Sequence, residues 1–93
     1  MRHEQVIIIG GGPAGIACAI QLKRYGIDPL IVEKDSIGGL LKNAWRLDNY
    51  VGFPAGISGV KMVEELQKHI RRFDIRIQDS EFRIQNFLDG EFL

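Results

Sequence analysis

The sequence predicts an α/β fold in which two helices alternate with three parallel strands, in the spatial order 3-2-1. The first observation is a continuous apolar run, residues 5–9, that leads into a glycine-rich turn. Such a run is typical of a strand buried on both faces of a parallel sheet. A second apolar run follows at 28–33, and an alternating run at 75–78 indicates a third strand. Helical segments separate the three, which predicts parallel strands with right-handed crossovers.

The two helices are bounded by recognisable start and stop residues. The first is expected from about Pro13, a favourable first residue, to Tyr25, which precedes a glycine. The second is expected from Ser58, an N-cap residue, to about Phe73. Its apolar side chains recur at helical spacing and predict one buried face, formed by Val63, Leu66, Ile70 and Phe73.

The end of the chain predicts the start of a β-meander. Two strand-like runs within residues 82–93 are separated by Asp89-Gly90, a hairpin turn signal. The second of these runs has barely begun where the sequence stops. Residues 1–93 are therefore interpreted as the N-terminal part of one incomplete domain.

Size and composition narrow the function classes. A chain of 93 residues forms at most one small domain. Its 12 basic and 12 acidic residues cancel, so charge indicates neither a nucleic-acid partner nor an anionic membrane. No run has the length of a secretory or membrane-spanning segment, which by default favours a cytoplasmic protein.

The reactive side chains show no catalytic or metal-binding pattern. The only cysteine, Cys18, allows neither an intramolecular disulfide nor a thiolate metal site. It falls between two alanines of the first helix, and we expect a small buried packing residue. No acid–His–nucleophile arrangement accompanies the histidines, so no catalytic residue is expected.

The glycine-rich turn predicts a site for the pyrophosphate of a dinucleotide. Its sequence, Gly10-Gly11-Gly12-Pro13-Ala14-Gly15, has the spacing G-x-G-x-x-G. The first glycine allows a tight turn out of the strand, the second allows the backbone to approach the pyrophosphate, and the third allows close packing of the helix on the sheet. The free N–H groups and the positive dipole end of the helix would face the anion.

Glu33 is the candidate ligand of the adenosine ribose. It ends the second strand and lies 18 residues beyond Gly15, close to the roughly 20 expected for the carboxylate that binds a ribose hydroxyl. A carboxylate at this position favours an unphosphorylated ribose. The alternative is a solvated acid at the end of a strand.

A long irregular stretch, residues 35–58, separates the second strand from the second helix. A loop of this length in a compact domain is usually functional or disordered, and its aromatic and apolar content argues against disorder. We therefore expect it to wrap a ligand. Its aromatic residues Trp45 and Tyr50 either border that ligand or pack the loop on the domain.

Taken together, these residues resemble the N-terminal part of the thioredoxin-reductase-like FAD flavoproteins, over essentially the whole chain. The glycine turn resembles the FAD-type version in that family. Gly38-Gly39-Leu40-Leu41, followed by the run 48–59, resembles the loop that embraces the flavin. Plain NAD-binding Rossmann domains lack this second motif, so it favours FAD. Binding of NAD in place of FAD at the glycine turn is kept as an alternative.

For the nucleotide half of FAD, the resemblance implies contacts at the glycine turn and at the end of the second strand. Gly12, Pro13 and Ala14 would line the pyrophosphate. Glu33 would bind the adenosine ribose, with Lys34 beside it.

For the flavin and the adenine, the resemblance implies four further contacts. Gly39 and Leu40 would approach the flavin, and Asn49 would donate or accept a hydrogen bond near its ring, unless it is only a turn-forming residue. The backbone near Glu81 or Phe82 would touch the adenine.

The chain departs from the family pattern at two loop positions. Leu40 stands where the family commonly has Gln, and Val51 stands where it usually has Pro. Both indicate a divergent relative. The redox Cys-x-x-Cys pair of the family, its NADPH domain and the segment that completes its flavin pocket lie beyond the N-terminal region.

Two hypotheses for function follow. The first is the FAD-binding segment of an NAD(P)H-dependent flavoprotein oxidoreductase, inactive by itself. The alternative is a non-enzymatic nucleotide-binding module completed by a partner subunit. In either case the apolar edge of the first strand would pair with the missing segments of the domain or with a partner chain.

Overall fold

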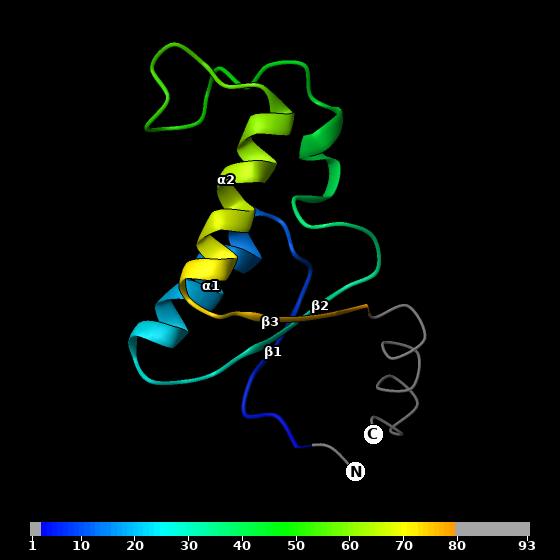
Figure 1. Ribbon diagram of the computed structural model, residues 1–93, viewed down its shortest axis with the longest axis vertical. Helices are drawn as coiled ribbons and strands as arrows, with labels where there is room; N and C mark the ends of the chain where they lie inside the picture. Colours follow the sequence, from blue (N-terminus) through cyan, green and yellow to red (C-terminus); the bar gives the residue numbers. More distant parts are fainter. Residues whose placement is uncertain (1–2, 80–93) are drawn as a thin grey trace.

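A computed structural model describes residues 3–79 and places one three-stranded parallel sheet beside two helices (Figure 1). The strand order is β1-β2-β3, with Ile8 paired to Ile31 and Ile31 to Ile77. This confirms the predicted α/β class and strand order. The elements are β1 (Ile7–Ile9), α1 (Pro13–Arg24), β2 (Leu30–Glu33), the 3-10 helix η1 (Gly39–Asn43), α2 (Gly59–Arg72) and β3 (Arg76–Asp79).

The predicted boundaries agree with the structure to within a few residues. Strands β1 and β2 each begin two residues later than expected, and each helix ends one residue earlier. Ser58 caps α2 as predicted, because its side-chain oxygen accepts the backbone N–H of Lys61. The expected meander, with Glu81 and Phe82, lies outside the described residues.

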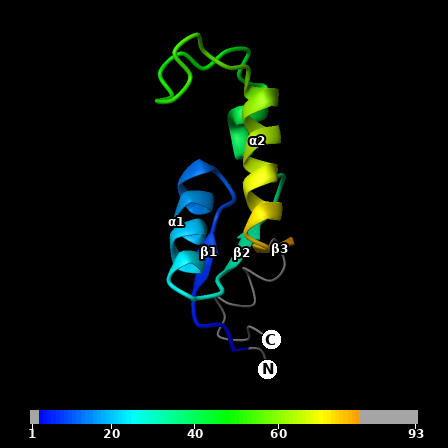
Figure 2. The ribbon, with the colours of Figure 1, turned by 60° about the vertical axis from the view of Figure 1, so that its left-hand side comes forward.

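The core lies between the two helices and one face of the sheet (Figure 2). Ile16 and Ala19 of α1 meet Ile31 of β2, all three at most 1% exposed. On α2 the fully buried residues include Leu66, as predicted, and Met62, which the predicted face omitted. Ile70 and Phe73 are partly buried against the same cluster.

Cys18 is exposed. The prediction of a buried packing cysteine is wrong, because the buried side of α1 is defined by Ile16 and Ala19. Position 18 is rotated by two helical steps from residue 16 and therefore lies toward solvent.

Segment η1 is seated against the start of α2 by a contact that only glycine allows. The N–H of Gly59 donates to the carbonyl of Ala44 at 2.9 Å. A Cβ built on Gly59 would collide with the carbonyl oxygens of Leu41 and Ala44. Because glycine has no side chain, the backbone of the loop can pack directly against the start of the helix.

A network of charged side chains joins the strands at the end of the sheet opposite the glycine turn. Arg76 of β3 donates to both carboxylate oxygens of Glu4, at 2.7 and 3.2 Å, and its Nε lies 3.0 Å from Asp28. Lys23, in the last turn of α1, pairs with Asp28 at 2.9 Å. The hydrogen bond from Lys23 and the positive charge of Arg76 lower the pKa of Asp28, and the bonds to Glu4 raise the pKa of Arg76.

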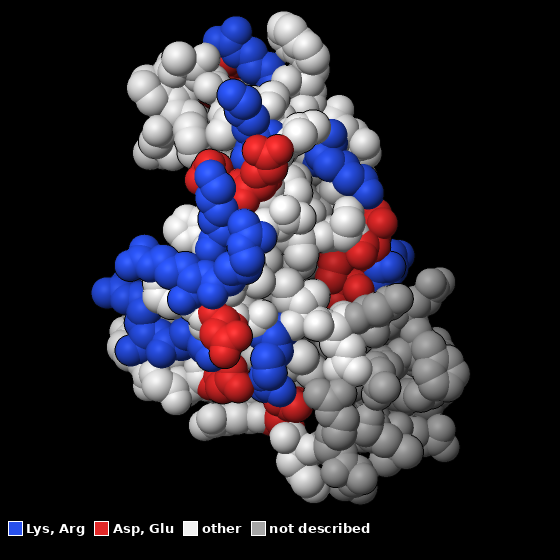
Figure 3. All heavy atoms as spheres, viewed as in Figure 1, with Lys and Arg blue, Asp and Glu red and all other residues white. Residues whose placement is uncertain are grey.

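Basic side chains gather over the C-terminal ends of the two long helices (Figure 3). The last turn of α1 holds Lys23 and Arg24, and that of α2 holds Arg71 and Arg72. Cations at these positions complement the negative ends of the helix dipoles. Neither helix within residues 3–79 has the length and apolar content needed to cross a membrane.

We expect Gly59→Ala to destabilise the protein by about 1–3 kcal/mol, the usual cost of overpacking a site that cannot give way. The added methyl group would meet two backbone oxygens rather than a movable side chain. Urea unfolding followed by circular dichroism measures the change. The control is Val60→Ala at the adjacent position, whose side chain is 58% exposed, and it should stay within about 0.5 kcal/mol of wild type. Equal stabilities of the two variants would contradict the close approach.

Asp28→Asn should lower stability at neutral pH, and the difference from wild type should disappear in acid. The pKa of Asp28 is lowered in the folded state from its ordinary value of 3.8. Its contribution is therefore complete above that value and is lost as pH falls through the lowered folded pKa. Unfolding midpoints measured between pH 7 and pH 2 test this. In a Lys23→Met background the pH-dependent difference should shrink, and an unchanged difference would rule out Lys23 as its main cause.

Candidate nucleotide-binding site

The glycine turn connects β1 to α1 and is bonded to the neighbouring strand. Gly10 has φ of +108°, a conformation that favours glycine, and its N–H donates to the carbonyl of Val32 at 2.8 Å. A Cβ on Gly15 would collide with the carbonyl oxygen of Gly10 and would lie 3.2 Å from Ile8. The first and third glycines of the motif thus have the steric roles that the sequence indicated.

The start of α1 is open toward solvent. Gly12 is the N-cap residue and makes no side-chain cap, Pro13 follows it, and the first turn contains no acidic residue. A Cβ on Gly12 would meet no atom within 4 Å, and Ala14 is exposed. The first N–H groups of a 12-residue helix therefore border free space, an arrangement that fits an anionic phosphate.

Glu33 lies beside the turn, 22 residues away from it in sequence. One carboxylate oxygen accepts the N–H of Gly11 at 2.7 Å, and the other accepts the N–H of Asp35 at 3.0 Å. Each oxygen retains a lone pair for a further donor. The contact with a ribose stays a prediction, whereas the bond to Gly11 is a role that no pattern in the sequence indicated. Lys34, the next residue, is exposed.

The first part of the long loop is docked on the same turn. Gly38, with φ of +94°, donates its N–H to the carbonyl of Gly11 at 2.8 Å. A Cβ on Gly38 would lie 2.6 Å from Val63 of α2. Gly39 follows at the start of η1 with φ of +58°, and the side chain of Leu40 is 83% exposed. Hydrogen bonds through Gly11 therefore join the turn to Glu33 and to Gly38.

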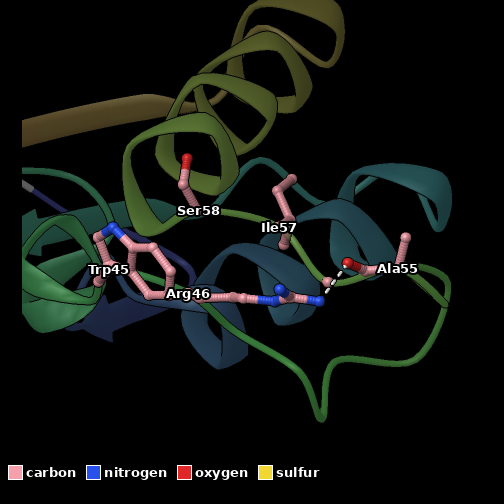
Figure 4. Close-up of a pocket in the computed structure, with 6 residues that line it drawn as sticks. Trp45, Arg46, Ala55, Ile57 and Ser58 are labelled. Carbon is pink, nitrogen blue, oxygen red and sulfur yellow. Dashed lines mark hydrogen bonds between the residues drawn. The ribbon is translucent and has the colours of Figure 1, made fainter.

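The outer part of the loop is closed at its base by an antiparallel bridge. Leu47 and Ile57 exchange backbone hydrogen bonds of 2.7 and 3.0 Å. Arg46 binds Asp48 at 2.7 Å. Arg46 also donates to the carbonyl of Ala55 at 2.8 Å (Figure 4). These contacts surround a hollow of about 330 Å³ lined by Trp45, Arg46, Ala55, Gly56, Ile57 and Ser58.

Asn49 belongs to the outer part of the loop. The outer loop lies beyond the N-terminal end of α2 in both ribbon views (Figures 1 and 2). Asn49 is exposed and lines a second hollow of about 250 Å³ formed by residues 48–54. Trp45 is 86% exposed, so it does not pack the loop onto the domain. Tyr50 meets Phe53 edge to face, with ring centroids 6.4 Å apart.

Comparison with known proteins agrees with this geometry. Residues 7–50 match the family described as pyridine nucleotide-disulphide oxidoreductase. A thioredoxin reductase of Mycolicibacterium smegmatis is 40% identical over 78 residues, which cover 82% of this chain and 25% of that protein. A glucosaminate ammonia-lyase of Pseudomonas fluorescens is 35% identical over 77 residues, which cover 83% of this chain and 24% of that protein.

Solved structures show the same relationship. The ferredoxin-flavin thioredoxin reductase of Clostridium acetobutylicum superposes with a TM-score of 0.69 and 33% identity, over 78% of this chain and 25% of that one. The chain thus spans about a quarter of the length of the relatives it matches. With the parallel sheet and the glycine turn, these matches show that the chain belongs to the thioredoxin-reductase-like pyridine nucleotide-disulphide oxidoreductases, as their N-terminal segment.

Proposed function

We propose that this chain is the FAD-binding segment of an NAD(P)H-dependent flavoprotein oxidoreductase. The observation that carries the proposal is the open glycine turn with the Glu33 carboxylate on one side and η1 on the other. The free N–H groups of α1 would hold the pyrophosphate, and Glu33 would bind the adenosine ribose with a remaining lone pair. Lys34 would lie beside that ribose.

The surroundings of Gly12 fit this cofactor. A phosphate needs the backbone to come close, and the space that a Cβ on Gly12 would occupy is empty. The loop that begins at Gly38 favours FAD over NAD, because an NAD site has no flavin to enclose. Gly39, Leu40 and Asn49 are the residues that we assign to the flavin side.

The protein would contribute binding and orientation rather than a reactive side chain. When bound, FAD would supply the redox chemistry between NAD(P)H and an electron acceptor. Relatives with this segment bear the names of different reactions, a thioredoxin reductase and an ammonia-lyase. We therefore propose that this segment binds the cofactor and that the rest of the parent protein determines which reaction is catalysed. We also propose that the parent protein is cytoplasmic.

Exposed apolar side chains on the loop indicate that the flavin side needs further protein. Leu40, Trp45 and Val51 are 83%, 86% and 95% exposed. Large apolar groups gathered in one loop are typical of a surface that becomes covered. The parent flavoprotein would cover them with the flavin and with its remaining domains, which is why we propose that the segment has no turnover alone.

The second candidate function is a non-enzymatic nucleotide-binding module completed by a partner subunit. Strand β1 is an edge of the described sheet, and Ile9 on it is 62% exposed. An open apolar edge invites pairing with another chain. Size-exclusion chromatography of the natively expressed protein separates the two candidates, because a monomer without a co-purifying chain would contradict the partner subunit.

Gly12→Ala should leave the fold intact and weaken FAD binding by about tenfold or more, the effect of blocking one close backbone contact. The added methyl group meets no protein atom, but it would occupy the space proposed for the pyrophosphate. Quenching of flavin fluorescence on titration measures the affinity, and thermal unfolding without cofactor checks the fold. Ala17→Ser, at an exposed position of α1, adds one atom away from the turn and should bind FAD like wild type. Equal affinities of all three proteins would exclude the turn as the site.

The purified chain should show no more than one turnover with NADPH and an artificial electron acceptor, even when loaded with FAD. The reason is that we assign neither a nicotinamide site nor a closed flavin pocket to the part of the chain that the structure describes, residues 3–79. Absorbance at the NADPH band measures the rate. Sustained oxidation in proportion to the amount of chain, absent in a Gly12→Ala preparation, would disprove inactivity in isolation.

A further inference from the structure

We propose that Glu33 is also a positioning residue for the loop that follows it. Its carboxylate fixes the backbone of Gly11, and Gly11 in turn fixes Gly38 and the start of η1. The nucleotide half and the flavin half of the site would then be coupled through one backbone residue. This inference rests on the proposed function for its consequence in binding, but the structural coupling can be tested without any ligand.

The backbone of Gly11 is bonded on both sides. Its N–H donates to the carboxylate of Glu33 at 2.7 Å, and its carbonyl accepts the N–H of Gly38 at 2.8 Å. Gly11 and Gly38 are both buried. Bonds away from water are stronger and tolerate little displacement. A shift of the glycine turn is therefore transmitted directly to Gly38.

Side-chain packing makes this path stiff. A Cβ on Gly11 would lie 2.7 Å from the terminal carbon of Ile37 and 3.4 Å from Cβ of Glu33. Gly38 also packs closely against the side chain of Val63 of α2. Gly38 then accepts the N–H of Leu41, the first hydrogen bond inside η1. The path runs from β2 through the turn to η1, and α2 supports its end.

Glu33 has the chemistry to serve the turn and a ligand together. A carboxylate accepting a backbone N–H makes a charge-assisted bond, stronger than one between neutral groups. Its two oxygens offer about four acceptor sites, and the described contacts with Gly11 and Asp35 use one on each oxygen. A ribose hydroxyl could bind the same carboxylate without breaking either contact.

A second tether means that losing Glu33 would displace η1 rather than unfold it. Lys42 of η1 reaches Ser36 at 2.9 Å and Asp35 at 3.4 Å. Gly59 holds the other end of the segment through Ala44. These contacts bypass Gly11, so a change at Glu33 should appear as a local shift at Gly38 in an otherwise folded protein.

The test compares Glu33→Met, which has a similar length and no good acceptor, with Glu33→Gln, whose side-chain oxygen can still accept the N–H of Gly11. In the isotope-labelled full chain without ligand, the Met variant should move the amide resonance of Gly38, whose N–H donates to Gly11 rather than to Glu33. The Gln variant should restore it to near the wild-type position. Glu64→Ala, an exposed carboxylate of α2, should leave it unchanged.

Binding of two nucleotides separates positioning from direct ribose contact. ADP carries the adenosine ribose and pyrophosphate of FAD, and 2′,3′-dideoxyadenosine diphosphate lacks the hydroxyls that Glu33 would bind. If Glu33 positions the turn, Glu33→Met weakens binding of both ligands, by about fivefold or more for the dideoxy compound, within the usual range of coupling between sites. If Glu33 only contacts the ribose, the dideoxy affinity stays at the wild-type value, and the coupling to binding is disproved.

The remaining outcomes also decide the matter. An unmoved Gly38 amide in Glu33→Met would overturn the positioning role. If the Met variant does not fold, Glu33→Ala gives the same comparison with a smaller side chain. Failure of the wild-type chain to bind ADP, its dideoxy analogue and FAD would refute the proposed function, while the Gly38 shift would still confirm or refute the positioning role in the free protein.

Discussion

The structure depends on two places where backbone meets backbone without an intervening side chain. At Gly15 the start of α1 approaches the carbonyl of Gly10, and at Gly59 the start of α2 approaches the carbonyls of Leu41 and Ala44. The first contact forms the turn between strand and helix, and the second seats the loop on α2. If either helix were moved outward to admit a Cβ, the glycine turn and η1 would separate. The candidate site exists because both helices begin this close.

The regular elements could be predicted from the sequence because their signals are local. A proline at the first residue, a serine N-cap and an unbroken apolar run depend only on neighbouring residues, and Pro13, Ser58 and the run ending at Ile9 lie where predicted. Strand ends depend on the partner strand. β1 begins at Ile7 because Ile7 is the first residue that pairs with β2, and no pattern within residues 5–9 could indicate that register.

The incorrect predictions concern side chains whose surroundings are set by tertiary contacts. Cys18 belongs to a type that is often buried, yet it is exposed. Met62 completes the buried side of α2, although the i, i+3, i+7 pattern was satisfied without it. In each case the helix was predicted correctly, but the prediction of which of its side chains are buried was incorrect.

The hydrogen bonds that order the glycine-rich backbone were the least predictable feature of the candidate site, and they would matter most for the proposed binding of a nucleotide. Glycines lose more conformational freedom than other residues when they are fixed, so a turn that became ordered only with its ligand would bind weakly. Here Val32 holds Gly10, Glu33 holds Gly11, and Gly11 holds Gly38. Because these bonds form within the protein, much of the ordering cost is met during folding rather than on binding. The hydrogen-bonded backbone includes no reactive side chain, and the matching segment occurs in relatives named for different reactions, a glucosaminate ammonia-lyase and a thioredoxin reductase.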